Sequence, residues 1–158
     1  VSNTSPLTNL AAIGQFELLE VLFSEVYIPL AVMSELSFGG GNWPGVAEVE
    51  RSKWVHVEQV GNRVLVDALR LDLDFGEAET IVLALEMQAD LILLDEVAAR
   101  FAARHFNLKV MGVVGILVRA KRLNLIAEVR AYLDALRQQA GFYLSDAVYQ
   151  HALNLADE

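Results

Sequence analysis

Two polar residues stand directly after short apolar runs, where the chain is predicted to leave a strand and begin a helix. Asn3 follows the first such run, and Asp95 follows the uninterrupted apolar run 91–94. In a parallel α/β sheet, ligands bind in the crevice beyond the carboxyl ends of adjacent strands. We therefore expect Asn3 and Asp95 to face one crevice. A purely structural alternative exists for Asp95, which has the residue type that caps a following helix.

Three glutamates could bring further carboxylates to this crevice. Glu35 lies late in a predicted helix whose neighbouring residues are mostly apolar. A carboxylate beside an apolar stripe is costly unless it is paired, bound to a metal or able to reach solvent at the helix end. Glu77 and Glu79 open the long helix that follows Gly76. Because side chains two residues apart on a helix point in nearly opposite directions, only one of this pair can face a shared site.

The helix start favours one glutamate of that pair. Asp74 and Glu77 have the spacing of a capping box, in which each side chain binds the backbone N–H of the other residue. This pattern gives Glu77 a structural role, so Glu79 is the stronger candidate for the crevice and Glu77 the weaker one. If Glu35, Glu79 and Asp95 converge beside Asn3, their oxygen atoms suit a hard divalent cation.

The elements that must position these residues alternate along the chain. Short apolar runs are followed by helical patterns, of which residues 75–87 form the strongest. This alternation favours a mostly parallel sheet with right-handed crossovers. A length of 158 residues fits a single domain over residues 1–158. The predicted strands are 1–3, 26–28, 54–57, 91–94 and 110–112. Further helices are predicted to begin at Pro6 and at Pro29, and to span residues 16–22, 63–71, 97–106, 113–122, 125–138 and 145–155.

Charge is distributed unevenly along the sequence. The net charge of -9 argues against a protein that coats nucleic acid nonspecifically. Residues 100–138 nevertheless hold 8 of the 12 basic side chains and only 2 of the 21 acidic ones. This segment could steer a phosphodiester toward an acidic crevice, although ordinary solvated helix faces explain the same pattern equally well. The candidates for steering RNA are Arg100, Arg119, Lys121 and Arg122.

Composition sets further bounds on the protein class. Apolar residues make up 54% of the chain, which suits strands buried on both faces. No apolar run approaches the ~18 residues of a membrane-spanning helix, and no signal peptide is recognisable, so a cytoplasmic protein without a membrane partner is expected. The chain has no cysteine, which excludes a disulfide scaffold or a thiolate metal site.

The order of the candidate residues resembles the PIN-domain family of metal-dependent nucleases. Residues 3–7, Asn-Thr-Ser-Pro-Leu, are similar to the family's opening motif, in which Asp or sometimes Asn precedes Thr or Ser. Glu35 matches the second acid of the family, Glu79 the third and Asp95 the fourth. Further details are similar to a prokaryotic PIN-like subfamily: Gly76-Glu77-Ala78-Glu79, Leu93-Leu94-Asp95-Glu96 with Arg100, and Gly112 before an apolar helix.

This resemblance implies a three-layer α/β/α sandwich with a mostly parallel central sheet. It also implies Mg²⁺ or Mn²⁺ bound by Asn3, Glu35, Glu79 and Asp95, cleavage of RNA, and a VapC-like toxin role beside a small antitoxin. PIN-like proteins commonly dimerise, so a homodimer is expected. One position departs from the usual pattern: Asn3 stands where the family usually has Asp. An amide oxygen can still bind a hard cation but adds no negative charge, so metal affinity should fall.

Other classes of function remain open or are disfavoured by the residues. The main alternative is a catalytically degenerate PIN-like module that binds RNA or an antitoxin. A phosphoacceptor receiver domain needs paired acids after its first strand, and Asn3 with Thr4 does not supply them. His56, His105 and His151 are scattered without His-x-x-x-His spacing, which disfavours zinc catalysis.

Overall fold

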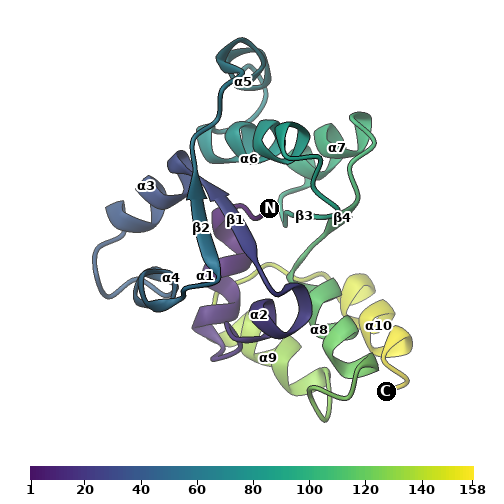
Figure 1. Cartoon of the computed structure of the whole chain (residues 1–158). Helices are drawn as coiled ribbons and strands as arrows, with labels where there is room; N and C mark the ends of the chain where they lie inside the picture. The colour runs from purple at the N-terminus through teal and green to yellow at the C-terminus, as the bar shows by residue number, and fades with distance from the viewer.

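The computed structural model describes all 158 residues. The fold consists of short strands connected by helices (Figure 1). The strands are β1 (Val26–Pro29), β2 (Val55–Glu58), β3 (Ile92–Leu93) and β4 (Val110–Met111). The helices are α1 (Thr4–Ala12), α2 (Leu18–Phe23), α3 (Leu30–Phe38), α4 (Val46–Arg51), α5 (Arg63–Leu69), α6 (Phe75–Glu86), α7 (Val97–His105), α8 (Val113–Arg122), α9 (Arg130–Gln138) and α10 (Asp146–Leu155).

The N-terminal residues join two small parallel strand pairs into one sheet. β1 pairs with β2 and β3 pairs with β4, both in parallel. The Ser2 N–H donates a hydrogen bond of 2.9 Å to the Tyr27 carbonyl on β1, and the Asn3 N–H donates one of 3.1 Å to the Leu93 carbonyl on β3. The order is therefore β2, β1, the N-terminal segment, β3 and β4. The predicted parallel α/β sheet is confirmed, and the sheet is small.

Helices cover both faces of this sheet. In Figure 1, α5, α6 and α7 lie on one side of the strands, and α1, α2, α8, α9 and α10 lie on the other. Strand β3 shows why both layers are needed. Leu93 belongs to the apolar cluster built largely from α1 and α8–α10, whereas Ile92 belongs to the cluster around α6 and α7. Alternate side chains of one strand thus bury against opposite layers, as in the predicted three-layer sandwich.

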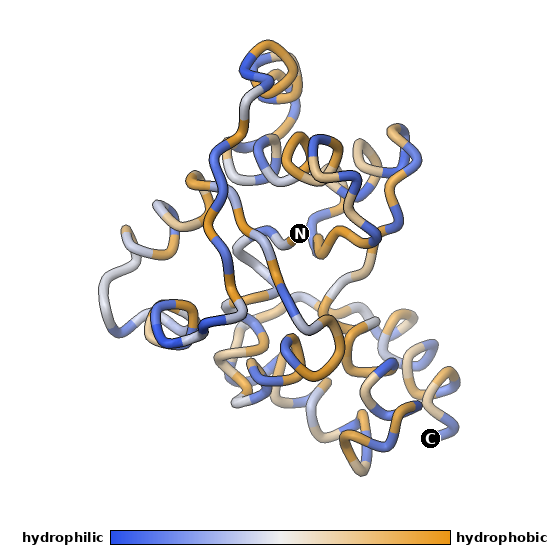
Figure 2. Tube along the Cα trace, in the orientation of Figure 1, coloured by the Kyte–Doolittle hydropathy of each residue, from blue (hydrophilic) through white to orange (hydrophobic).

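The C-terminal layer departs from the predicted helix boundaries at one place. Helix α9 begins at Arg130, whereas the sequence pattern predicts a helix from residue 125. Its first N–H groups, those of Val129 and Arg130, donate to the side-chain carboxylate of Glu158. The helix start is therefore set by a cap at the far end of the chain, which local sequence cannot reveal. Figure 2 shows hydrophobic and hydrophilic residues alternating along α8–α10, as expected for helices buried on one side.

No helix of this protein is both long enough and apolar enough to cross a membrane.

Candidate functional site

Asn3 occupies the centre of the carboxyl edge of the sheet. It precedes α1 as its N-cap residue, and its side chain is 4% exposed. The side-chain N–H group donates a long hydrogen bond of 3.5 Å to a carboxylate oxygen of Glu96. The amide oxygen Oδ1 is buried and has no hydrogen-bond partner. An unsatisfied buried acceptor costs about 1–3 kcal/mol, so this oxygen is a ready position for a ligand.

Glu35 reaches the same edge from α3. The Thr4 hydroxyl, one residue beyond Asn3, donates a hydrogen bond to the Glu35 carboxylate. Gly76 at the start of α6 makes room for this carboxylate, because a Cβ at that position would overlap it. Burial raises the pKa of Glu35, and the negative charges of Asp74 and Glu96 act in the same direction, while hydrogen bonds from Thr4 and the Gly76 backbone oppose them.

Glu77 combines the capping role predicted from the sequence with a place among these acids. One carboxylate oxygen, Oε2, accepts from the Asp74 N–H at 3.1 Å, and the Glu77 N–H donates to Asp74 at 2.8 Å. The second oxygen, Oε1, accepts no hydrogen bond from the protein. Burial raises the pKa of Glu77, and the charges of Asp74, Glu96 and Glu35 raise it further. A capping role therefore leaves Glu77 free to contribute one oxygen to the crevice.

Glu79 has a different environment from the other candidate acids. Its side chain is buried, accepts a hydrogen bond of 3.0 Å from the Ala31 N–H and forms an ion pair with Arg63. Helix α3 has no side-chain cap of its own, because Pro29 stands at its N-cap position. Glu79 supplies that cap from α6. The sequence predicted Glu79 in the crevice; its carboxylate is bonded to Arg63 and to the start of α3, directly after β1, whereas the charge of Glu35 acts on Glu77.

Asp95 follows β3 as predicted and is held by three donors. Its Oδ1 accepts from the Val113 N–H at 2.8 Å, and its Oδ2 accepts from Ser5 at 3.3 Å and Asn9 at 3.4 Å. Gly112 is needed beside it, because a Cβ there would lie 2.7 Å from Oδ1. Burial raises the pKa of Asp95 to about 6, with a further contribution from the charge of Glu96.

Glu96 is the acid that sequence reasoning did not select. It follows Asp95 directly and accepts the hydrogen bond from Asn3. Its negative charge contributes to the raised pKa values of Glu35, Glu77 and Asp95, so it lies near all three. The available signal was the acidic pair Asp95-Glu96 at the end of a buried strand, which offers two consecutive carboxylates at the edge where ligands bind.

The residues at this edge suit a hard divalent cation held through few direct bonds. No group of three or more His, Cys, Asp or Glu side chains is arranged so that it could hold a metal ion by itself, so any cation here would depend on one or two carboxylates, the Asn3 amide oxygen and water. Mg²⁺ ordinarily binds through one or two carboxylates and keeps several waters. The acids Glu35, Glu77 and Glu96 and the unsatisfied Oδ1 of Asn3 fit that mode. A bound cation would relieve the mutual repulsion among these carboxylates.

The basic residues predicted to steer RNA have three different environments. Arg100 lies between the Leu94 carbonyl, to which it donates at 3.4 Å, and the position of Gly112. Arg119 and Arg122 are exposed on α8. Lys121 instead donates to the Ala127 carbonyl and pairs with Glu158 at 3.8 Å, so it supports the capped start of α9.

The fold and this edge define the class of protein: a parallel α/β domain with acids gathered at the carboxyl ends of its central strands. A family model described as a PIN domain matches residues 1–158, the whole chain. The chain therefore belongs to the PIN-domain family, a family of nuclease type. No match was found among curated proteins or among solved structures.

Proposed function

We propose that this protein is an Mg²⁺- or Mn²⁺-dependent endoribonuclease. The observation that carries the proposal is the unsatisfied Oδ1 of Asn3, whose side-chain N–H donates to Glu96, at an edge where the charge of Glu96 raises the pKa values of Glu35, Glu77 and Asp95. Like charges held close together repel one another, most strongly where one of them, Glu77, is buried, and a bound cation would offset that repulsion. The location at the carboxyl edge of a parallel sheet is where such a site is expected.

Each residue has a defined part in this proposal. Asn3, Glu35, Glu77 and Glu96 would hold the metal directly or through its waters, and Asp95 would complete the acidic edge while it remains bonded to Val113. Glu79 holds the start of α3, and hence Glu35, in position. When bound, the metal supplies a Lewis acid for the phosphodiester and lowers the pKa of its water. The guanidinium of Arg100, next to Asp95 and Gly112, is placed to meet a phosphate oxygen.

The proposed biological role is that of a toxin that cleaves RNA and is held in check by a small antitoxin protein. Family membership supports this role, and so does the apolar surface left for a partner or a second copy. On α7, the exposed fractions of Val97 and Phe101 are 84% and 75%, and this pair lies one helical turn apart on the same side of the helix. Light scattering of the purified protein tests the homodimer, and co-purification with the product of an adjacent small gene tests the antitoxin.

A catalytically degenerate binding module is the second candidate. Two observations favour it: Asn3 brings no charge to the edge, and no three ligand-type side chains form a complete cage. This candidate predicts binding of RNA or an antitoxin without metal-dependent cleavage.

Metal binding and cleavage, measured on matched variants, separate the two candidates. Calorimetry should show Mn²⁺ binding to the wild type, and Mn²⁺ should raise the melting temperature in a way that EDTA reverses. Glu96→Gln should weaken binding and cleavage of a labelled RNA. Glu50→Gln, at an exposed position on α4, removes one charge away from the site and should change neither. Absence of Mn²⁺ binding in the wild type would refute the nuclease proposal.

A further inference from the structure

A groove follows the outer edge of the sheet and includes one member of the candidate site. It lies along the edge strand β4, between α7 on one side and α8 and α10 on the other, and has a volume of 890 Å³. Asp95 lines it, together with Gly112 at the start of α8. The groove is therefore continuous with the acidic edge. Its size is at the upper end of the ~300–1,000 Å³ typical of small-molecule sites.

Four arginines line this groove, and Asp95 is the single acid among the lining residues; the arginines are Arg100, Arg104, Arg119 and Arg122. None of the four forms an ion pair, whereas Arg63 and Arg137 elsewhere in the chain do. Arg122 donates to the Leu155 carbonyl at 3.0 Å, a neutral acceptor that orients the group without cancelling its charge. Arg119 is shared with the second pocket of the protein, where its guanidinium lies 5.3 Å from the centre of the Phe23 ring. Arg100, Arg104 and Arg122 give the groove a positive charge that is complementary to a polyanion, on a protein of net charge -9.

The surface between the arginines is apolar and carries exposed aromatic area. Val114, Val118 and Leu155 contribute to the lining, as do the consecutive aromatic residues Phe142 and Tyr143. The Tyr143 side chain is 89% exposed, so one ring face is free for stacking. Unpaired bases stack on such rings, and this stacking is tolerant of sequence. A duplex would present only its phosphates to this surface, because its bases are already stacked and paired.

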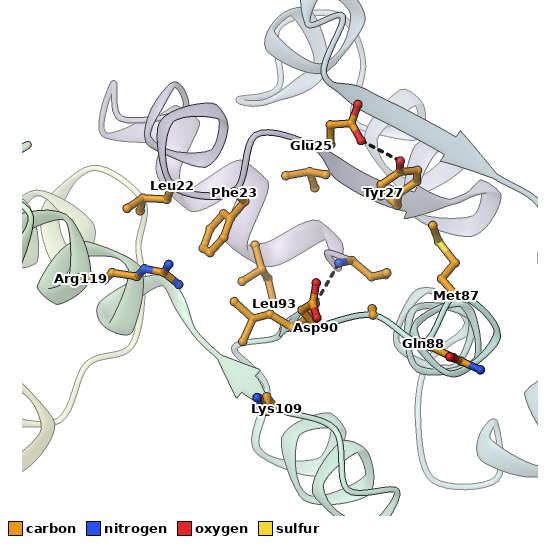
Figure 3. Close-up of a pocket in the computed structure, with 14 residues that line it drawn as sticks. Leu22, Phe23, Glu25, Tyr27, Met87, Gln88, Asp90, Leu93, Lys109 and Arg119 are labelled. Atoms are coloured by element: carbon orange, nitrogen blue, oxygen red, sulfur yellow. Dashed lines mark hydrogen bonds between the residues drawn. The ribbon is translucent and has the colours of Figure 1, made fainter.

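The other large pocket of the protein has a different electrostatic character. It has a volume of 560 Å³ and lies around the start of β1 and the residues that precede β3 (Figure 3). Lys109 and Arg119 on its lining are balanced by Glu25 and Asp90. This balance gives a polyanion no advantage there. The edge strand β4 has only two residues, too few for a peptide to add as a stable strand, which favours a nucleic acid over a peptide in the groove.

The geometry points to a binding path for single-stranded RNA in the β4 groove, with backbone phosphates on Arg104, Arg119 and Arg122 and a base stacked on Tyr143. Arg100 marks the point at which the strand reaches Asp95. Cleavage of the bound strand rests on the proposed function, whereas binding of the strand needs the groove but not the metal. The binding path and the nuclease activity can therefore be refuted separately.

Fluorescence anisotropy with a labelled single-stranded oligoribonucleotide in EDTA tests the path without cleavage. Arg104→Glu combined with Arg122→Glu should weaken binding by at least about tenfold and lower the salt slope by roughly 0.7 for each lost phosphate contact. Tyr143→Ala should weaken binding about fivefold or more while leaving the salt slope unchanged. The matched control, Arg51→Glu combined with Lys53→Glu at exposed positions outside the groove, should bind as the wild type does. A duplex of the same sequence should bind more weakly than the single strand.

Three results would overturn this path. One is the absence of RNA binding by wild-type protein whose circular dichroism spectrum shows it to be folded. Another is an equal loss of affinity in the Arg51/Lys53 control, which would mean that net charge alone governs binding. The last concerns the groove variants: if they change the oligomeric state measured by light scattering but bind RNA as the wild type does, the groove is a contact between protein chains. If the wild-type protein binds RNA in the groove but shows no metal-dependent cleavage, only the nuclease proposal is refuted.

Discussion

Glu77 and Glu79 stand two residues apart on α6 and face opposite environments. Glu77 is coupled to Glu35 and Glu96, and its pKa is raised, whereas Glu79 is bonded to Arg63 and the Ala31 N–H. The rotation of about 200° between side chains two positions apart on a helix produces this division. The two carboxylates therefore have separable roles, one at the site and one in the fold.

Glutamine substitutions at these two positions should have opposite consequences. Glu77→Gln keeps the acceptor for Asp74 but removes a charge that its neighbours repel, so stability should be unchanged or slightly higher while Mn²⁺ affinity falls. Glu79→Gln weakens the ion pair with Arg63 and the cap of α3, so the free energy of unfolding should fall by about 1–3 kcal/mol. Urea unfolding and calorimetry measure the two effects. Loss of stability in Glu77→Gln with metal binding unaltered would contradict this division.

Stability without metal should fall as the pH rises through the titration of Asp95. Its pKa is raised from 3.8 to about 6 in the folded protein, so between these values the folded state holds a proton that the unfolded chain has lost. Stability is then highest below this window and lower above it, by on the order of 2–3 kcal/mol. Glu35 and Glu77, with raised pKa values, act in the same direction.

Urea unfolding in EDTA across this pH range checks the sign. Asp95→Asn should flatten the dependence and should be more stable than the wild type at neutral pH, because asparagine keeps an acceptor for the Val113 N–H and cannot ionise. Saturating Mn²⁺ should also reduce the dependence in the wild type. A wild-type protein whose stability rises with pH through this window would contradict the burial of Asp95 described here.

Asn3→Asp should make the protein more dependent on metal. The new carboxylate would face Glu96, to which Asn3 now donates a hydrogen bond, so repulsion should lower the melting temperature in EDTA. With Mn²⁺ present the added charge should tighten binding, and cleavage should be unchanged or faster. Thermal melts with EDTA and with Mn²⁺ measure the difference. A smaller Mn²⁺-induced rise than in the wild type would remove Asn3 from the metal site.

Gly76→Ala should impair the site while leaving the fold intact. Alanine normally favours a helix over glycine by about 0.5–1 kcal/mol, but here the added Cβ would overlap the Glu35 carboxylate. That carboxylate is the end of a flexible side chain and can move away, so stability should change little. Mn²⁺ affinity should fall because Glu35 is displaced. Gly41→Ala, in a loop with open space around the position, is the control and should retain the affinity.

Much of the fold follows from local sequence patterns. Three local signals predicted a mostly parallel sheet connected by helices, because each is contained within a few residues: the apolar run 91–94, the capping pair Asp74 and Glu77, and the alternation of strands with helices. The three-layer sandwich followed from the family resemblance. The start of α9 did not follow in this way. Its cap is the Glu158 carboxylate, and only the folded chain brings that residue near Arg130.

For the candidate site, the sequence by itself determined the candidate positions at the ends of the first and fourth predicted strands, since the carboxyl edge of a parallel sheet is where Asn3 and Asp95 must emerge. Tertiary structure alone decided which glutamates gather there. The capping pattern argued for Glu79 over Glu77. In the structure Glu79 is bonded to Arg63 and caps α3, while the charges of Glu35 and Glu96 act on Glu77. Hydrogen-bond donors and charges that are far apart in sequence determine these positions, because a buried carboxylate is stable only where donors or cations satisfy it.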